Sequence, residues 1–264
     1  MPILTGNIGE RRMPGFARLV WEHVVFWGGI AALAAAGITV TLLAIVAAPF
    51  LTKVRRVWMG QRILNGFFRR YFRLLAATGL FRFDLDELTS LTRERPMVLV
   101  ANHPALLDAM LVAARVPNVV GIMKANVRLS PIYAGAASLA GYARADRPIE
   151  MIHAMVNALG AGHHVLVFPE STRTVRRPVN PFKGDFALIA KQARVPVQAI
   201  VIETDSPYLG KGWSTLRKPP MPVCFKVRLG RRFDGCTDVK PFAREVEAYF
   251  ASELVGSPRD RVIP

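Results

Sequence analysis

His103 and Asp108 stand five residues apart after an apolar run, and together they could act as a general base. Residues 97–101, Met-Val-Leu-Val-Ala, have the continuous apolar character of a buried strand. Pro104 suits the first turn of a helix, which we predict over residues 105–114. His103 would then lie at the carboxyl end of a strand, where open α/β sheets bind their ligands. An Asp on the helix could hold one imidazole nitrogen and leave the other free to accept a proton.

This pair alone does not establish a catalytic site. A His and an Asp at this spacing can arise by chance in a chain with five histidines. In that case Asn102 and His103 would only cap a helix, and Asp108 would face the solvent. A second polar motif is needed to decide between the two interpretations.

Such a motif follows the apolar run of residues 165–168, which also reads as a buried strand. If both runs belong to one sheet, the motif lies at the same edge as His103. Arg173 could bind a phosphate or a carboxylate through its forked donors, and Glu170 could orient that arginine or a substrate hydroxyl. The alternative is a polar loop held by a structural Arg–Glu ion pair. The motif consists of Pro169, Glu170, Ser171, Thr172 and Arg173.

In this order and spacing, the two motifs resemble the glycerophospholipid acyltransferase family, whose best-known members acylate 1-acylglycerol-3-phosphate. The resemblance covers roughly residues 83–202. It implies that His103 and Asp108 are catalytic and that the second motif binds the acyl acceptor. The residues that match the family's acceptor block are Phe168, Pro169, Glu170, Thr172 and Arg173.

At other positions the sequence departs from the residues that are usual in this family. Ser171 replaces the glycine that is usual in the family, which adds a side chain beside the acceptor. Residues 141–147 match a block that usually reads Gly-x-Ile-Phe-Ile-Asp-Arg, but Ala-Arg-Ala at residues 143–145 replaces its apolar trio. Lys124 stands where members of the family often have a lysine. The resemblance thus implies acceptor binding by Lys124, Arg147, Glu170, Ser171, Thr172 and Arg173.

The implied mechanism is one that the residues themselves permit. His103 would take the proton of an acceptor hydroxyl, whose oxygen attacks an acyl thioester, while Asp108 stabilises the imidazole cation. The thioester, acyl-CoA or acyl-carrier protein, is a co-substrate, so no cofactor is expected. Ser171 lacks the Gly-x-Ser-x-Gly context of a hydrolase nucleophile.

No metal is expected. His163 and His164 are adjacent, so their side chains would point apart in a strand. Cys224 and Cys236 have no matching His cluster, and they indicate neither a zinc site nor a disulfide framework.

The charge of the chain predicts an anionic partner. The 264 residues carry a formal net charge of +16, and nucleic acid and anionic membrane are the usual partners of so basic a protein. Residues 24–51 contain no charged residue and are long enough to span a bilayer. Their glycines also permit a helical hairpin that enters one leaflet.

A basic helix follows directly. Residues 53–75 place aromatic and aliphatic side chains on one stripe and most of their arginines on the other, as in helices that lie at a membrane interface. Anionic lipid is the polyanion nearest to this segment, so we expect membrane lipid and no nucleic acid as the partner. The positive-inside rule places the catalytic domain on the cytoplasmic face of the cell membrane.

Short apolar runs alternate with helical segments from residue 83 onward, which predicts an α/β fold with a mixed, largely parallel sheet flanked by helices. We expect a membrane anchor with a basic amphipathic helix over residues 1–82 and an acyltransferase domain over residues 83–264. The predicted strands are residues 97–101, 119–123, 141–145, 165–168, 197–202 and 223–229. The predicted helices are residues 105–114, 131–140, 148–159, 186–193 and 239–254.

The sequence therefore predicts a membrane-bound O-acyltransferase that acylates a lysophospholipid, with 1-acylglycerol-3-phosphate as acceptor and phosphatidic acid as product. A non-glycerol acceptor such as a lyso-aminolipid is the first alternative. A thioesterase, which uses water as acceptor, and a non-catalytic protein that binds anionic lipid are the others. The sequence indicates no oligomeric state.

Overall fold

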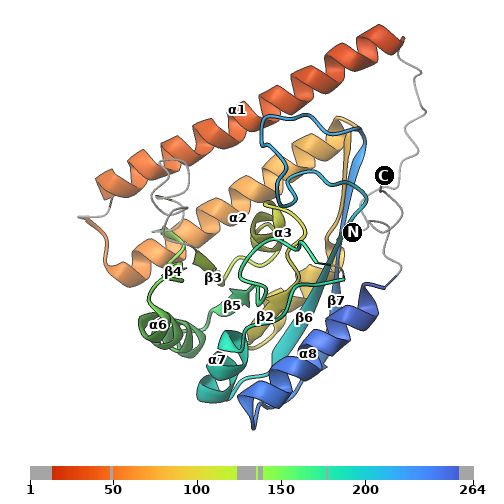
Figure 1. Ribbon diagram of the computed structural model, residues 1–264. Helices are drawn as coiled ribbons and strands as arrows, with labels where there is room; N and C mark the ends of the chain where they lie inside the picture. Colours follow the sequence, from red (N-terminus) through yellow and green to blue (C-terminus); the bar gives the residue numbers. More distant parts are fainter. Residues whose placement is uncertain (1–13, 48–49, 124–134, 136–138, 177, 256–264) are drawn as a thin grey trace.

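The computed structural model describes residues 14–47, 50–123, 135, 139–176 and 178–255, and it shows a seven-stranded sheet with helices on both faces (Figure 1). The strand order is β1-β7-β6-β2-β5-β3-β4. All neighbours are parallel except β6 and β7, so the predicted mixed, largely parallel sheet is confirmed. The strands are β1 (Phe81–Asp84), β2 (Val98–Ala101), β3 (Val119–Met123), β4 (Ala143–Arg144), β5 (His164–Val167), β6 (Val197–Thr204) and β7 (Val223–Phe233).

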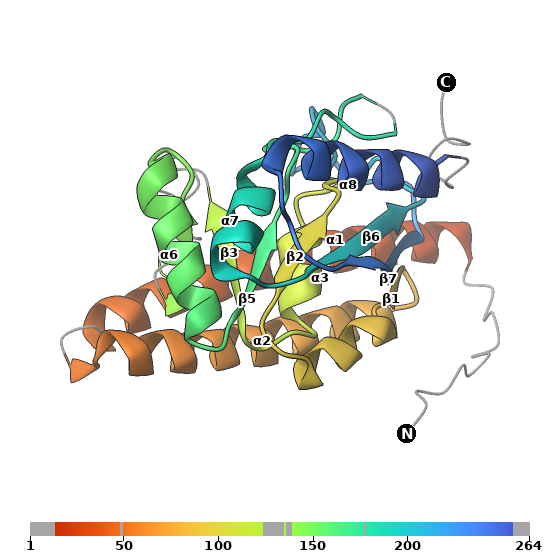
Figure 2. The same ribbon diagram turned by 90° about the horizontal axis from the view of Figure 1, so that it is seen from below.

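Helices of different parts of the chain cover the two faces. The helices are α1 (Gly15–Ala47), α2 (Lys53–Ala77), the 3-10 helix η2 (Asp86–Arg93), α3 (Asp108–Ala113), α6 (Pro148–Gly160), α7 (Asp185–Ala193) and α8 (Val239–Glu253). In Figure 2, α6, α7 and α8 lie on one side of the sheet, and α1 and α2 lie on the other.

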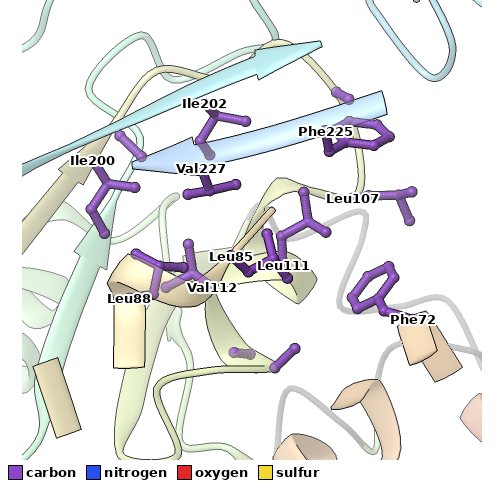
Figure 3. Packing of buried hydrophobic residues seen from close by; sticks show 14 of the residues in the cluster. Phe72, Leu85, Leu88, Leu107, Leu111, Val112, Ile200, Ile202, Phe225 and Val227 are labelled. Carbon is purple, nitrogen blue, oxygen red and sulfur yellow. The ribbon is translucent and has the colours of Figure 1, made fainter. Parts of the chain in front are cut away.

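The central strand β2 is buried on both sides, which explains its continuous apolar sequence. Because side chains alternate along a strand, Val98 and Val100 pack with α6, α7 and α8. Leu99 and Ala101 face the opposite cluster, which includes residues of α1, α2, η2 and α3. Figure 3 shows part of that second cluster, with Phe72 of α2, Leu88 of η2 and Leu111 of α3 among its members. Each such side chain stabilises the fold by about 1.5–3 kcal/mol.

Most predicted elements are present, with three differences. The strand β1 and the helix η2 were not predicted, because a four-residue edge strand and a short 3-10 helix leave little local pattern. The helix predicted from residue 105 begins at Asp108 instead, because the Asp108 carboxylate accepts the backbone N–H of Ala105 and holds the preceding residues in a turn. The predicted strand 141–145 is reduced to Ala143–Arg144. The predicted helix 131–140 lies largely outside the described residues.

The apolar N-terminal segment forms one continuous helix, α1, which runs alongside α2 (Figure 1). It is long and apolar enough to cross a membrane, and the glycines of Gly15–Ala47 introduce no hairpin. Only 11% of its most apolar window is buried. A core helix of a soluble protein would be mostly buried. An exposed apolar surface of this size indicates a site of contact with a membrane or another protein.

The helix α2 is amphipathic and is fastened to the sheet. Leu64, Phe72 and Leu75 are buried, whereas Arg55, Arg62, Arg69, Arg70 and Arg73 are exposed. The side chain of Gln61 donates to the carbonyl groups of Val119 and Ala140 at 3.4 and 3.3 Å. Residues of α1 and α2 share a hydrophobic cluster with the sheet. The boundary between residues 1–82 and 83–264 stays a prediction.

Candidate active site

The side chain of Asn102 fixes the turn that follows β2. Its Nδ2 donates to the carbonyl of Ile202, and its Oδ1 accepts from the N–H of the same residue, both at 2.8 Å. The buried amide thereby continues the pairing of β2 with β6 by one more residue. This holds the chain rigidly where His103 leaves the sheet.

His103 and Asp108 form a hydrogen-bonded pair, as the sequence predicted. The distance from Nδ1 of His103 to Oδ2 of Asp108 is 2.8 Å, and the carboxylate is fully buried while the imidazole is 19% exposed. An ionised carboxylate only accepts, so the proton of a neutral imidazole lies on Nδ1 and the lone pair on Nε2. The N–H of Ala105 donates to the same Oδ2 at 2.8 Å and keeps the carboxylate in place. The alternative with an exposed, solvated Asp108 is therefore wrong.

The ring of Phe168 stacks against the imidazole of His103. Their centroids are 4.2 Å apart and their planes differ by 24°. Phe168 directly follows β5, which is the parallel neighbour of β2. The aromatic ring therefore covers one face of the imidazole and restricts its rotation.

Glu170 joins the two sequence motifs. Its Oε1 accepts from the backbone N–H of His103 at 2.9 Å and from the hydroxyl of Thr174 at 2.8 Å, and its Oε2 accepts from the N–H of Asn180 at 2.9 Å. Burial raises the pKa of Glu170, and these three donors oppose that rise. The N–H of Thr174 also donates to the carbonyl of His103 at 2.8 Å. Glu170 therefore positions the histidine backbone, and the structural ion pair with Arg173 considered from the sequence does not form.

Arg173 is held by the loop between β6 and β7. Its Nη1 donates to the carbonyl groups of Leu209 and Gly210, both at 2.8 Å. The carbonyl of Leu209 also accepts from the N–H of Leu106 at 3.0 Å, within the turn between His103 and Asp108. Arg173 is thus oriented by the same backbone segment that supports the turn between His103 and Asp108.

Ser171 adopts a left-handed backbone conformation, with φ of 55°. Glycine reaches this region without a Cβ clash, which explains the glycine that is usual at this position in the resembled family. Thr172 lies beside it, and its hydroxyl accepts from Nζ of Lys211 at 3.4 Å.

Arg147 lies apart from this cluster. It precedes α6, is exposed, and forms an ion pair with Glu150 at 3.1 Å. Arg147 follows β4 and Arg173 follows β5, and β3 lies between these two strands in the sheet, so the strand ends are separated by about 10 Å. The structure therefore does not place Arg147 and Arg173 side by side. Lys124 lies outside the described residues.

Several residues near the site could not be assigned from the sequence alone. Thr174 and Asn180 resemble ordinary loop residues in sequence, and the Leu209 carbonyl is a backbone group in a distant loop. Only the extension of the polar motif beyond Arg173 hinted at Thr174. Among the residues that the structure describes, no group of three or more His, Cys, Asp or Glu side chains could hold a metal ion.

The fold and the His–Asp pair together define an α/β domain suited to general-base chemistry at the carboxyl edge of its sheet. Residues 82–203 match the family model "Acyltransferase". The match confirms the resemblance to the glycerophospholipid acyltransferases.

Curated relatives extend the comparison. The chain is 29% identical over 136 residues to a 1-acyl-sn-glycerol-3-phosphate acyltransferase of Cocos nucifera, an alignment that covers 49% of this chain and 44% of the relative. It is 30% identical over 128 residues to the lyso-ornithine lipid O-acyltransferase of Pseudomonas aeruginosa, covering 44% of this chain and 49% of the relative. The chain thus spans about half the length of these relatives.

A solved structure shares the fold. The 1-acyl-sn-glycerophosphate acyltransferase PlsC of Thermotoga maritima superposes with a TM-score of 0.64 at 20% identity, over 92% of this chain and 97% of that chain. At this identity the likeness establishes the fold.

Proposed function

We propose that the protein is a membrane-associated O-acyltransferase that transfers a fatty acyl group from a thioester to the free hydroxyl of a lysophospholipid. The observation that supports this most strongly is the 2.8 Å bond between Nδ1 of His103 and the buried Asp108 carboxylate. It leaves Nε2 as the basic atom at the sheet edge. The acyltransferase-family match over residues 82–203 favours acyl transfer as the reaction that uses this base.

In the proposed reaction, Nε2 of His103 removes the proton of the acceptor hydroxyl as its oxygen attacks the thioester carbonyl. An oxygen–acyl bond forms, the carbon–sulfur bond breaks, and the proton leaves with the thiolate. Asp108 stabilises the imidazole cation during this exchange. The acyl group passes directly to the acceptor, and the donor is acyl-CoA or acyl-carrier protein.

We propose 1-acylglycerol-3-phosphate as the acceptor, which would give phosphatidic acid. Relatives named for this activity and the presence of Arg173 beside the catalytic turn support this acceptor. A guanidinium with free donors after its two carbonyl bonds can bind a phosphate. We further propose that Lys124, Ser171 and Thr172 contribute to the acceptor site.

A lyso-aminolipid is the second candidate acceptor, and two observations favour it. Arg147 is paired with Glu150 on the exposed rim, so it supplies no second guanidinium beside Arg173. A relative at 30% identity is named a lyso-ornithine lipid O-acyltransferase. An acceptor without phosphate would not need two arginines at one site.

An enzyme with a lipid acceptor and an exposed apolar helix such as α1 is expected to work at a membrane. We propose that α1 attaches the protein to the cell membrane, with the catalytic domain on the cytoplasmic face. The exposed apolar side chains of α1 support this attachment, and the exposed arginines of α2 support contact with anionic lipid.

The test is an assay of the purified full-length protein with acyl-CoA or acyl-carrier protein and a panel of lysolipids. We expect acylated product from 1-acylglycerol-3-phosphate, and loss of that product in His103→Ala. The matched control is His153→Ala, because His153 is exposed on α6. Thioester cleavage without lipid product would favour a thioesterase, and no turnover of any lysolipid would favour a lipid-binding protein.

A further inference from the structure

The loop between β6 and β7, residues 205–222, is basic and has an apolar tip. It contains Lys211, Arg217 and Lys218, and no acidic residue occurs between Ser206 and Phe233. A solvent-facing loop of ordinary composition mixes both charges. Apart from Asp205 at its start, whose carboxylate accepts from the N–H of Cys224, this loop carries only basic charges. These lie beside the exposed Leu216, as in surfaces that bind anionic lipid.

The tip of the loop is ordered by its own contacts and by the half-buried Trp213, which also packs against the hydrophobic cluster below α1 and α2. Nε1 of Trp213 donates to the carbonyl of Arg217 at 2.9 Å, and the guanidinium of Arg217 lies 4.6 Å from the centroid of the Trp213 ring. Leu216, between them in sequence, is 62% exposed. A tryptophan with a bonded N–H, an exposed leucine and a cation form the combination found at membrane–water interfaces.

The loop is continuous with the apolar helix α1. Nζ of Lys218 pairs with Glu22 of α1 at 2.8 Å, and the ring of Tyr208 lies 6.2 Å from that of Phe26. Figure 1 shows the loop, in blue, passing beside α1. Exposed apolar side chains on the same half of α1 include Phe16, Leu19, Val20 and Trp27. The exposed apolar surface of the helix and the tip of the loop thus belong to one region of the molecule.

The other end of the loop reaches the candidate active site. The carbonyl groups of Leu209 and Gly210 hold Arg173, and Nζ of Lys211 lies 3.4 Å from the hydroxyl of Thr172. The loop thus lies between α1 and Arg173. A lipid acceptor that moves from the bilayer to His103 would pass along it.

We propose that residues 207–221 form a second membrane-binding element, in which Trp213 and Leu216 enter the interface of an anionic bilayer and Lys211 and Arg217 contact its phosphates. Lys218 is engaged by Glu22 and ties the element to α1. The proposal rests on the proposed function, because a lipid acceptor is the reason for a membrane contact beside the site.

The experiment places an environment-sensitive fluorophore on Leu216→Cys in the full chain, with Cys224→Ser and Cys236→Ser. The matched control carries the probe on Thr237→Cys, an exposed residue before α8 on the other face of the sheet. Both are mixed with vesicles of phosphatidylcholine containing phosphatidylglycerol, and flotation confirms binding. We expect a blue shift and quenching by nitroxide-labelled lipid at position 216, and neither at 237. A probe at 216 that stays accessible to aqueous iodide while the protein is bound would overturn the proposal, as would equal quenching at both positions.

A second measurement keeps the native cysteines. Lys211→Ala with Arg217→Ala should weaken partitioning onto the anionic vesicles about tenfold or more, because each basic residue near the surface contributes. Lys240→Ala with Arg244→Ala on α8 is the control of equal charge and should leave it unchanged. If both double variants bind the anionic vesicles equally weakly, the effect is one of general charge, and the proposal that the loop binds the membrane is rejected. Acyl transfer to a detergent-dispersed acceptor is measured in parallel, so that failure of the loop proposal is distinguishable from failure of the proposed function.

Discussion

The backbone N–H of His103 donates a hydrogen bond of 2.9 Å to Oε1 of Glu170, a residue 67 positions later in the chain. This bond connects the two motifs that the sequence presents separately. It ties the ends of β2 and β5 together, because the turn after β2 and the loop after β5 share the buried Glu170 carboxylate. Substitutions at the site and in the elements that position it can therefore test this arrangement.

Replacement of His103 by alanine should lower acyl transfer by about 10²–10⁴-fold, because the general base is lost. Asp108→Asn should lower it less, since an imidazole base remains and only its orientation and its cation stabilisation suffer. Initial rates at saturating substrates measure both effects, and unchanged circular dichroism verifies folding. Transfer by His103→Ala within a few-fold of the wild type would reject the assignment.

Arg173→Ala should raise KM for 1-acylglycerol-3-phosphate and leave KM for the thioester nearly unchanged. Arg147→Ala should have a smaller effect, because Arg147 is exposed and paired with Glu150. The measurement is initial rate against acceptor concentration, with this acceptor and with a phosphate-free lysolipid. A wild type that prefers the phosphate-free lipid, or an acceptor KM untouched by both substitutions, would contradict the phosphate-binding role.

Stability should fall as the pH drops below about 6.5, in part because of His164. This histidine is buried: Nδ1 accepts from the N–H of Met97 at 3.3 Å, and Nε2 bonds to the carbonyl of Leu91 at 3.0 Å. Burial lowers the pKa of His164 from 6.5 in the folded protein, so the unfolded chain binds this proton at a higher pH than the folded one. The free energy of unfolding therefore falls as the pH drops from about 6.5 to the lowered pKa.

Burial also lowers the pKa of His163, which acts in the same direction. Denaturant unfolding in detergent from pH 7.5 to 5 measures this dependence. It should be reduced in His164→Asn and retained in His153→Asn. Equal slopes in wild type and His164→Asn would show that this histidine does not contribute.

Gly60→Ala should destabilise the protein, because its Cβ would lie 2.5 Å from the carbonyl oxygen of Leu139. Gly66→Ala in the same helix is the matched control, since its Cβ would meet only the end of the Arg70 side chain at 3.3 Å. Alanine favours a helix over glycine by about 0.5–1 kcal/mol, so the control should be neutral or stabilising. The thermal unfolding midpoint should therefore fall in Gly60→Ala and stay unchanged or rise in Gly66→Ala. Two equal shifts would mean that α2 does not pack as described.

Ser171→Gly should stabilise the protein by about 1 kcal/mol, because glycine adopts a φ of 55° without the Cβ strain of serine. Ser171→Val should destabilise it, since a β-branched side chain tolerates this region poorly. Unfolding midpoints of the two variants and the wild type test the order Gly, Ser, Val. A midpoint for Ser171→Gly below that of the wild type would indicate that the serine side chain makes a stabilising contact.

Local sequence signals were sufficient for the centre of the molecule. The apolar runs at β2, β5 and β6 are long enough and regular enough to predict buried strands, and the polar residues that follow β2 and β5 mark the sheet edge. The sequence alone could therefore assign His103, Asp108 and Arg173 to one edge. The helices α1 and α2 were predictable for the same reason, since length, apolar content and charge pattern are properties of a contiguous segment.

Relations between distant residues required the tertiary structure. The four residues of β1 become a strand only because β7 offers them a parallel partner. The turn before α3 exists because the Asp108 carboxylate accepts the N–H of Ala105, which shortens a helix that local propensity would start earlier. Arg147 and Arg173 have similar sequence contexts, yet the strand order separates their strand ends while Leu209 and Gly210 hold only Arg173. Strand order and long-range hydrogen bonds depend on the free energy of the whole packed chain, and no contiguous segment encodes them.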